Sequence, residues 1–508
     1  MTLTERLLVA NRGEIAVRIV RACRDLGIET VAVYSDADRT ALHVTMADYA
    51  ARLGPAPSAE SYLSIPRILE AAKKTGASLV HPGYGFLAES ADFARACADA
   101  GLTFVGPSPA AIEAMGSKTA SRVLMQRAGV PVVPGTTTPA RDAAGLAEFG
   151  RLAGYPIFLK ASAGGGGKGM RRVESENDVA SAFARAAAEA QASFGDGSIY
   201  AEKLLETPRH VEVQIAADRR GNRVAVGERE CSIQRRNQKV VEECPSPVVD
   251  PRLRARLLSA ALTAANAVDY DSCGTVEFLL APDGSFYFLE MNTRLQVEHP
   301  ITEEVWGVDL AVEMIRAALG EPLSFREEDL APRGHAIECR VYAEDARRGF
   351  APSPGVVGRL RLPEGPGIRN DVGIEPGSGV PIDYDPMLGK LVASASTRAA
   401  AIRRLARALE EYEISGVETT LPLFRELVLD PDFRAGAYHT QWLDAWLAKR
   451  KLDPSEATAD EAILAAGSLA IDGGALPAGE AVRTSRWRET ARAEALRTPL
   501  DRRRGTNP

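Results

Sequence analysis

The first 35 residues alternate between short apolar runs and one amphipathic segment. Residues 7–10 (LLVA) and 30–35 (TVAVYS) have the apolar character of buried strands, and 15–27 has the periodicity of a helix. A strand, a helix and a second strand in so short a stretch form a βαβ unit, which requires a parallel sheet. The same pattern continues beyond these strands, so we predict a doubly wound parallel α/β lobe over residues 1–115.

The composition restricts the class of protein but does not indicate its chemistry. Of the 508 residues 45% are hydrophobic and 25% charged, which is typical of a globular protein with several packed lobes. No apolar run is long enough for a membrane helix, and the N-terminal stretch is too short and too charged for a secretory signal. The net charge of −7 argues against a protein that coats nucleic acid. Six scattered cysteines without a CxxC pair favour reduced thiols, so we expect a cytoplasmic protein.

The middle of the chain is predicted to contain antiparallel strands. Residues 274–281 and 285–292 flank a Pro-Asp-Gly turn, as in a hairpin. Residues 199–205 and 210–218 also have the pattern of strands in an antiparallel sheet. A mixed α/β pattern returns over 335–445.

A glycine-rich segment follows a predicted strand that ends near Lys160. Gly164 to Gly167 leave a backbone without Cβ atoms, so their N–H groups can converge on a phosphate, and Lys168 adds positive charge. The segment lacks the GK[ST] ending of a P-loop. A flexible surface loop is the alternative, and the glycines alone do not decide between the two.

Carboxylates gather in the predicted hairpin over 274–292. Glu277 and Glu290 can point to the same side of paired strands, and Asn292 falls on that side too. Two carboxylates and an amide oxygen suit Mg²⁺ or Mn²⁺, the ions that accompany ATP phosphates. The alternative is a solvated hairpin whose glutamates pair with arginines. The apolar residues flanking Glu290 favour the metal site, because a carboxylate in such surroundings needs a partner.

The alternation of polar residues is predicted to continue beyond the hairpin. Counting by twos from Asn292 gives Arg294, Gln296 and Glu298. The guanidinium of the arginine can donate two hydrogen bonds to an oxyanion, and the neighbouring glutamate is a candidate base.

Several long motifs together resemble one family, the biotin carboxylases. The residues that carry the resemblance are MGSK (115–118), KASAGGGGKGM (160–170), EKLLETPRHVEVQ (202–214), CSIQRRNQKVVEE (231–243), EMNTRLQVEHP (290–300) and ECR (338–340). The resemblance spans about residues 3–447, with the motifs in family order.

The resemblance implies an α/β fold of the ATP-grasp class. It implies an N-terminal domain over 1–115 and an ATP-grasp domain over 116–330, with a hinged lid over about 132–204. A C-terminal mixed α/β domain follows over 335–447. The composition after residue 451 shifts to a Gly/Ala/Pro stretch and an arginine-rich end, so 451–508 is expected to be a flexible extension.

The roles of the family's site residues carry over where this sequence matches its motifs. The implied ATP contacts are Lys118, Lys160, Gly166, Gly167, Glu202, Lys203, Leu204, Leu205, His210, Gln234, Asn237, Glu277 and Glu290. The implied metal ligands are Glu277, Glu290 and Asn292, in agreement with the spacing. The implied bicarbonate pocket comprises Lys239, Arg294, Gln296 and Val297. Glu298 is the implied base, and Arg340 the residue that stabilises the enolate of biotin.

The implied reaction is the first half-reaction of an acyl-CoA or pyruvate carboxylase. It uses ATP, bicarbonate and Mg²⁺ or Mn²⁺, with two ions expected. No AMKM biotin-attachment motif occurs, and Lys390 belongs to a different motif, so biotin is expected on a separate carrier protein. A carboxyltransferase subunit would choose the acyl acceptor, and a homodimer is expected. Asn237 stands where many members have histidine, which puts one nucleotide contact in doubt.

Two other functions are compatible with parts of this pattern. Another ATP-grasp ligase would share the metal carboxylates and the glycine loop, but should lack RLQVEHP and the QRRxQK segment. A regulatory protein that has lost catalysis would be expected to have other residues in place of Glu298, Arg294 or Arg340, and all three are present.

Overall fold

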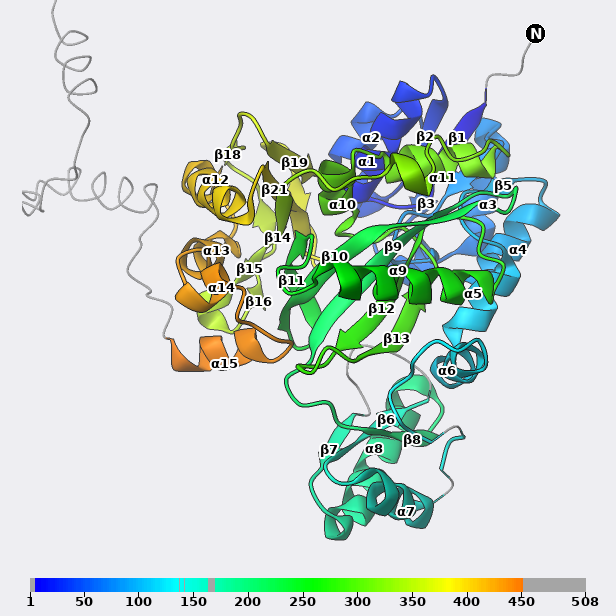
Figure 1. Ribbon diagram of the computed structural model, residues 1–508. Helices are drawn as coiled ribbons and strands as arrows, with labels where there is room; N and C mark the ends of the chain where they lie inside the picture. Colours follow the sequence, from blue (N-terminus) through cyan, green and yellow to red (C-terminus); the bar gives the residue numbers. More distant parts are fainter. Residues whose placement is uncertain (1–4, 137, 141, 163–169, 451–508) are drawn as a thin grey trace, which may run out of the picture. The chain divides into compact units, whose positions relative to one another are not determined.

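The computed structural model describes residues 5–136, 138–140, 142–162 and 170–450 (Figure 1). These residues belong to one compact unit. The side chains of Lys118 and Thr119 are not described. The glycine-rich segment and the predicted extension over 451–508 lie outside the described residues.

A five-stranded parallel sheet opens the chain, as the sequence predicts, with strand order β3-β2-β1-β4-β5. Leu7 and Val9 of β1 enter one hydrophobic cluster and Leu8 enters another, because successive side chains of a strand point to opposite faces. Both faces are therefore covered. The strands are Arg6–Val9 (β1), Glu29–Ser35 (β2), Tyr49–Gly54 (β3), Leu79–His81 (β4) and Thr103–Phe104 (β5). The helices are Gly13–Asp25 (α1), Leu42–Met46 (α2), Ile65–Thr75 (α3), Ala91–Asp99 (α4), Pro109–Gly116 (α5) and Lys118–Arg127 (α6).

A small antiparallel sheet with two helices forms within the predicted lid. Its strands, in the order β7-β6-β8, are Arg171–Val173 (β7), Ile157–Ala161 (β6) and Ile199–Lys203 (β8). The helices Ala143–Ala153 (α7) and Val179–Phe194 (α8) pack against it (Figure 1). Leu146, Ile157 and Ala186 belong to a hydrophobic cluster confined to these elements.

An eight-stranded antiparallel sheet carries seven of the predicted site residues on its strands: His210, Gln234, Lys239, Glu277, Glu290, Asn292 and Arg340. Its strand order is β13-β12-β9-β10-β11-β14-β21-β19. The strands are Arg209–Ala217 (β9), Arg223–Arg235 (β10), Gln238–Cys244 (β11), Gly274–Leu280 (β12), Phe286–Asn292 (β13), His335–Tyr342 (β14), Ile368–Val372 (β19) and Met387–Ala395 (β21). Because β11 pairs with β14, residues from 116–330 and from 335–447 share one sheet.

Helices cover both faces of this sheet. The helix Pro251–Asn266 (α9) runs across β9, β10 and β12 (Figure 1), and its Leu257 and Ala261 share a cluster with Val211 and Val213. The other helices are His299–Trp306 (α10), Leu310–Ala318 (α11), Arg398–Glu411 (α12), Leu421–Leu427 (α13), Pro431–Ala435 (α14) and Trp442–Lys449 (α15). Short strand pairs are Glu344–Asp345 (β15) with Ala351–Pro352 (β16), Gly355–Val356 (β17) with Gly379–Val380 (β20), and Leu360–Arg361 (β18) with Glu413–Ile414 (β22). Among the described residues, no helix has both the length and the apolar character needed to cross a membrane.

Two details differ from the sequence prediction. The two predicted strands form as Ile199–Lys203 (β8) and Arg209–Ala217 (β9), but they lie in different sheets, because β8 pairs with β6 and β9 with β10 and β12. The alternation predicted to run to Glu298 also stops early. The strand ends at Asn292, and a turn-rich stretch leads to α10, which begins at His299.

Candidate functional site

A cavity of ≈ 500 Å³ lies between the polar face of the large sheet and the small sheet of the lid region. Its volume is in the range of small-molecule sites. Sixteen of the residues predicted to form the site line it: Lys160, Glu202, Lys203, Leu204, Leu205, His210, Gln234, Asn237, Lys239, Glu277, Glu290, Asn292, Arg294, Gln296, Val297 and Arg340. The side chain of Lys118, and all of Gly166 and Gly167, lie outside the described residues.

The lid side of the cavity is built around Glu202. This glutamate of β8 accepts hydrogen bonds from Lys160 of β6 and from Arg122 of α6. Burial opposes ionisation of Glu202, but the two cations outweigh it and hold the pKa of Glu202 below its ordinary value. The strand ends at Lys203, so Leu204 and Leu205 line the cavity from beyond the strand that was predicted to include them.

Asn237 lies at the tip of the β10–β11 hairpin. Gln234 pairs with Lys239 and Arg235 with Gln238, which leaves a turn of two residues, Arg236 and Asn237. Both have positive φ, +51° and +65°. Asparagine is among the residues that adopt this left-handed conformation most readily, and two-residue hairpin turns favour it. The backbone therefore accounts for an asparagine here.

Glu277, one of the predicted metal ligands, contacts several neighbouring side chains. It lies opposite Glu290 in the β12–β13 register, so the two carboxylates share a face as predicted. Its Oε1 accepts hydrogen bonds from Lys239 Nζ at 2.8 Å and from Asn292 Nδ2 at 2.8 Å. Its Oε2 lies 2.9 Å from His210 Nε2. Burial disfavours the charge, yet Lys239 and His210 hold the pKa of Glu277 far below its ordinary value.

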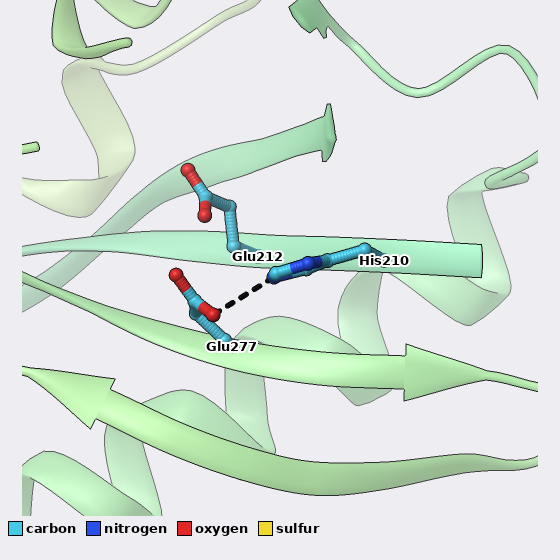
Figure 2. A group of neighbouring side chains, drawn as sticks. All are labelled: His210, Glu212 and Glu277. Atoms are coloured by element: carbon cyan, nitrogen blue, oxygen red, sulfur yellow. Dashed lines mark ion pairs between the residues drawn. The ribbon is translucent and has the colours of Figure 1, made fainter. Parts of the chain in front are cut away.

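His210, Glu212 and Glu277 converge from two neighbouring strands (Figure 2). His210 and Glu212 alternate on β9, and Glu277 of β12 lies opposite Glu212. Ligand atoms of the three lie within 4.8 Å of one another. With Glu290 and Asn292 on the next strand, this part of the sheet offers mainly oxygen donors next to a cavity, which fits the donor preference of Mg²⁺ or Mn²⁺.

Glu298 is fully buried behind the cavity lining, in contact with two cations. Its Oε1 accepts from Lys239 Nζ at 2.6 Å and its Oε2 from Arg340 Nη2 at 2.9 Å. Burial raises the pKa of Glu298, but Lys239 and Arg340 dominate and hold it well below the ordinary value. Glu298 is therefore ionised at neutral pH, as a proton acceptor must be. It reaches this position through the turn-rich stretch after β13 and directly precedes α10.

Lys239 joins Glu298 to the carboxylates of β9 and β12. Its Nζ lies 2.5 Å from Glu212, 2.8 Å from Glu277 and 2.6 Å from Glu298. Glu212 in turn accepts from Arg229 Nε at 2.5 Å, and both are fully buried. Alternating cations and carboxylates thus hold one another in place.

Arg294 reaches from the site to the N-terminal lobe. Its Nε donates to Glu89 Oε2 at 3.0 Å, its Nη2 to Asn292 Oδ1 at 3.0 Å and its Nη1 to Gln296 Oε1 at 3.1 Å. Glu89 follows the parallel strand β4 in the chain. The arginine is therefore fixed by both lobes.

A second cavity, of ≈ 410 Å³, adjoins the first. Arg294, Val297, Arg340, Tyr342 and Asp385 line both. The remaining lining comes mainly from the N-terminal lobe and from residues 383–387, and includes Asn11, Arg12, Ser58, Tyr84 and Phe86. The Arg340 side chain thus lies at the junction of the two cavities.

Sequence reasoning missed several residues in contact with the predicted ones. These are Arg122, Glu212, Arg229, Glu242 and Glu89. One signal was available for Glu212, because His210, Glu212 and Gln214 alternate in HVEVQ just as Glu290 and Asn292 do in the hairpin. The others contact the site through pairings between distant segments.

Comparisons with known proteins show the family of this chain. The family models that match describe the biotin carboxylase N-terminal domain (residues 3–112), the ATP-binding domain of the carbamoyl-phosphate synthase L chain (117–326) and the biotin carboxylase C-terminal domain (338–445). The chain is 52% identical over 439 residues to a biotin carboxylase of Halalkalibacterium halodurans, covering 86% of this chain and 97% of that protein. It is 51% identical to one of the pyruvate carboxylase subunits of Methanothermobacter thermautotrophicus, covering 87% of this chain and 90% of that protein.

A solved structure with bound ligands is also similar. It is the biotin carboxylase domain dimer of the Hydrogenobacter thermophilus 2-oxoglutarate carboxylase, in complex with MgADP, ADP and bicarbonate. The TM-score is 0.85 at 45% identity, and the match covers 90% of this chain and all of that one.

Proposed function

The chain belongs to the biotin carboxylase family, and on this premise we propose that it uses ATP and bicarbonate to carboxylate biotin. The observation that carries the proposal is a single cavity bringing together the predicted nucleotide, metal, bicarbonate and biotin residues. The buried base network of Glu298, Lys239 and Arg340 lies directly behind it.

The first step joins bicarbonate to the γ-phosphate of ATP. Lys239, Arg294, Gln296 and Val297 hold bicarbonate, whose proton passes to the Glu298 carboxylate. The bicarbonate oxygen attacks the γ-phosphorus, ADP leaves, and carboxyphosphate forms. Lys118 and Lys160, with Gly166 and Gly167, offset the phosphate charge.

The nucleotide lies against the lid. Glu202, Lys203, Leu204 and Leu205 contact the adenine, and His210, Gln234 and Asn237 contact the rest of the nucleotide. Leu279 and Leu289, together with Phe158, add apolar lining to this part of the cavity. Closure of the region 132–204 over the nucleotide would keep water from the labile carboxyphosphate.

Glu277, Glu290 and Asn292 would hold Mg²⁺ or Mn²⁺, two ions in all. When bound, the ions neutralise charge on the transferring phosphoryl group. The contribution of the chain itself is to keep Glu277 ionised and the three oxygens aligned, which Lys239, His210 and the β12–β13 register support.

The second step transfers CO₂ to biotin. Carboxyphosphate breaks into CO₂ and phosphate, and the phosphate takes the proton from N1 of biotin. The ureido oxygen becomes an enolate that the Arg340 guanidinium stabilises, and N1 then attacks CO₂. The second cavity, which shares Arg340 with the first, offers space for biotin next to this guanidinium.

Biotin would arrive on a separate carrier protein, and a carboxyltransferase subunit would pass the carboxyl group to an acyl-CoA or to pyruvate. We take residues 1–115, 116–330 and 335–447 as the three domains of each protomer in a homodimer. A cytoplasmic location is consistent with six buried cysteines that form no disulfide.

The direct test is ATP hydrolysis by the purified full-length chain with free biotin as acceptor. Hydrolysis should require bicarbonate and Mg²⁺ and should rise on addition of biotin. Turnover that depends on bicarbonate but ignores biotin, at any biotin concentration, would contradict the proposal.

A further inference from the structure

Two glutamates lie side by side beneath Arg340, on strands far apart in the sequence. Glu242 of β11 and Glu338 of β14 are direct partners in the antiparallel register. Directly opposite residues project from the same face of a sheet with their Cβ atoms about 5 Å apart. Both side chains are fully buried.

Cations border this pair on the same face. Arg340 lies two residues beyond Glu338, and Lys390 of β21 lies opposite Arg340. Lys390 Nζ donates to the Val297 carbonyl at 2.9 Å, and Arg340 Nη2 contacts Glu298. One buried charged layer therefore contacts two neighbouring residues of the site, Val297 through its main chain and Glu298 through its side chain.

Arg340 itself is held between two carboxylates. Its Nη2 lies 2.9 Å from Glu298 Oε2 on the cavity side and 2.5 Å from Glu242 Oε1 on the buried side. In the proposed reaction Glu298 accepts a proton and loses its charge. The contact with Glu298 then weakens, just before the guanidinium is needed for the biotin enolate. The contact with Glu242 involves no reacting group.

We propose that Glu242 is a positioning residue that anchors the Arg340 guanidinium for the carboxylation of biotin. This inference rests on the proposed function and deepens it. Neither glutamate lines either cavity that Arg340 lines, so neither is expected to touch substrate.

The charges around the pair differ between Glu242 and Glu338. Burial, together with the Glu242 carboxylate, raises the pKa of Glu338 well above its ordinary value, although Lys390 and Arg340 oppose the shift. Burial also raises the pKa of Glu242, to about 7, with Arg340 and Lys239 opposing and Glu298 adding to the rise. Two carboxylates this close cannot both ionise easily, and of the two it is Glu242 that contacts Arg340.

The experiment compares two rates in the full-length chain with ATP and Mg²⁺. The first is bicarbonate-dependent ATP hydrolysis without biotin, which reports the step that precedes the reaction of biotin. The second is the increase in that rate on adding saturating free biotin. For Glu242→Gln we expect the biotin-dependent increase to fall about 10- to 100-fold more than the basal rate, as for a group displaced by a fraction of an ångström to an ångström.

The adjacent Glu243 provides a matched control. It is equally buried and ion-paired, but lies on the opposite face of β11, in contact with Arg398 and His335. Glu243→Gln should lower stability and leave the ratio of the two rates unchanged. Glu338→Gln should also keep the ratio close to the wild-type value, because the ion pairs of Arg340 among the described residues are with Glu242 and Glu298 and not with Glu338.

Equal loss of both rates in Glu242→Gln would show a purely structural role and overturn the proposal, as would an unchanged ratio. If Glu242→Gln does not fold, Glu242→Asp retains the charge and withdraws it by one methylene group. A selective fall in its biotin-dependent rate supports the anchor, and an unchanged ratio overturns it. Failure of the proposed function is separately visible, because wild-type hydrolysis would then show no response to biotin.

Discussion

Strand β11 places two adjacent glutamates in opposite electrostatic environments. Glu243 meets Arg398 at 2.6 Å and His335 at 2.6 Å, and despite burial these contacts lower its pKa to about 2. Glu242, on the other face, shares Arg340 with Glu298 and lies opposite Glu338, and its pKa is raised to about 7. Burial is complete or nearly so in both cases, so the neighbours decide the sign of the shift.

The two faces of this part of the sheet therefore have different roles. On the face of Glu243, Val241, Ile337 and Leu391 share a hydrophobic cluster with α12 and α13. The face of Glu242, called the charged face below, also carries Glu338, Arg340 and Lys390, and their burial is costly in free energy. Arg340 contacts Glu298, and Lys390 contacts the main chain of Val297. A sheet that packs a core on one side can hold an unfavourable set of charges on the other, where chemistry needs them.

The largest effect is expected for Glu298→Gln, which removes the proposed base beside Arg340 and preserves the shape of its side chain. Bicarbonate-dependent ATP hydrolysis should fall about 10²- to 10⁴-fold, the usual contribution of a general base. Nucleotide affinity should change little, because Glu298 lies behind the cavity wall. Steady-state rates and equilibrium ADP binding check the two statements. Near-normal turnover in this variant would show that Glu298 is not the general base.

The next largest effect is expected for Lys390→Met, which removes a fully buried cation from the charged face. Lys390 lies 3.2 Å from Glu14 and 3.9 Å from Asp371, so its loss leaves two buried carboxylates with one cation fewer. The free energy of unfolding should fall by about 3–5 kcal/mol, as for other broken buried ion pairs.

Urea unfolding measures this loss, with Lys449→Met as the matched control. Lys449 is an exposed lysine of α15, where the same substitution should change stability by no more than about 0.5 kcal/mol. Similar changes in the two variants would show that the buried layer does not depend on Lys390.

The contrast also shows which features the sequence could predict. Glu277, Glu290 and Asn292 were placed together correctly because a tight hairpin and a period of two determine which side chains share a face. The parallel lobe followed from βαβ patterning in the same way. In both cases the relevant partners are close in sequence.

Partners far apart in sequence were not predictable in this way. The opposition of Glu242 and Glu338 depends on β11 pairing with β14, across α9, the β12–β13 hairpin and two further helices. The prediction that a strand-like alternation continues from Asn292 to Glu298 was wrong, because the strand ends at Asn292 and a turn-rich stretch begins there. Arg294, Gln296 and Val297 still line the cavity, and Glu298 lies behind it, because that stretch folds back over the sheet.

Glu243→Gln should show a smaller, pH-dependent loss of stability. Because the folded-state pKa of about 2 lies below the ordinary value of 4.5, the ionised Glu243 stabilises the fold above pH 4.5. That contribution disappears as the pH falls through 2. The variant should be less stable than wild type by about 2–3 kcal/mol at pH 7, with a gap that narrows on acidification. Urea unfolding across this pH range tests the sign, and a gap that widens in acid would contradict it.

The smallest effect, of the opposite sign, is expected for Glu14→Gln, which changes a residue of α1 that contacts Lys390 of the charged face. Burial raises the pKa of Glu14 to about 7, although Lys390 opposes the rise. A raised pKa means that the folded state keeps a proton that the unfolded state releases above pH 4.5, so Glu14 lowers stability progressively as the pH rises from 4.5 to about 7. Glutamine cannot ionise, so the free energy of unfolding of Glu14→Gln relative to wild type should increase by about 1–3 kcal/mol between pH 4.5 and pH 8. Parallel stability profiles for the two proteins would show that Glu14 ionises normally, and that the two faces of the sheet differ less than their contacts indicate.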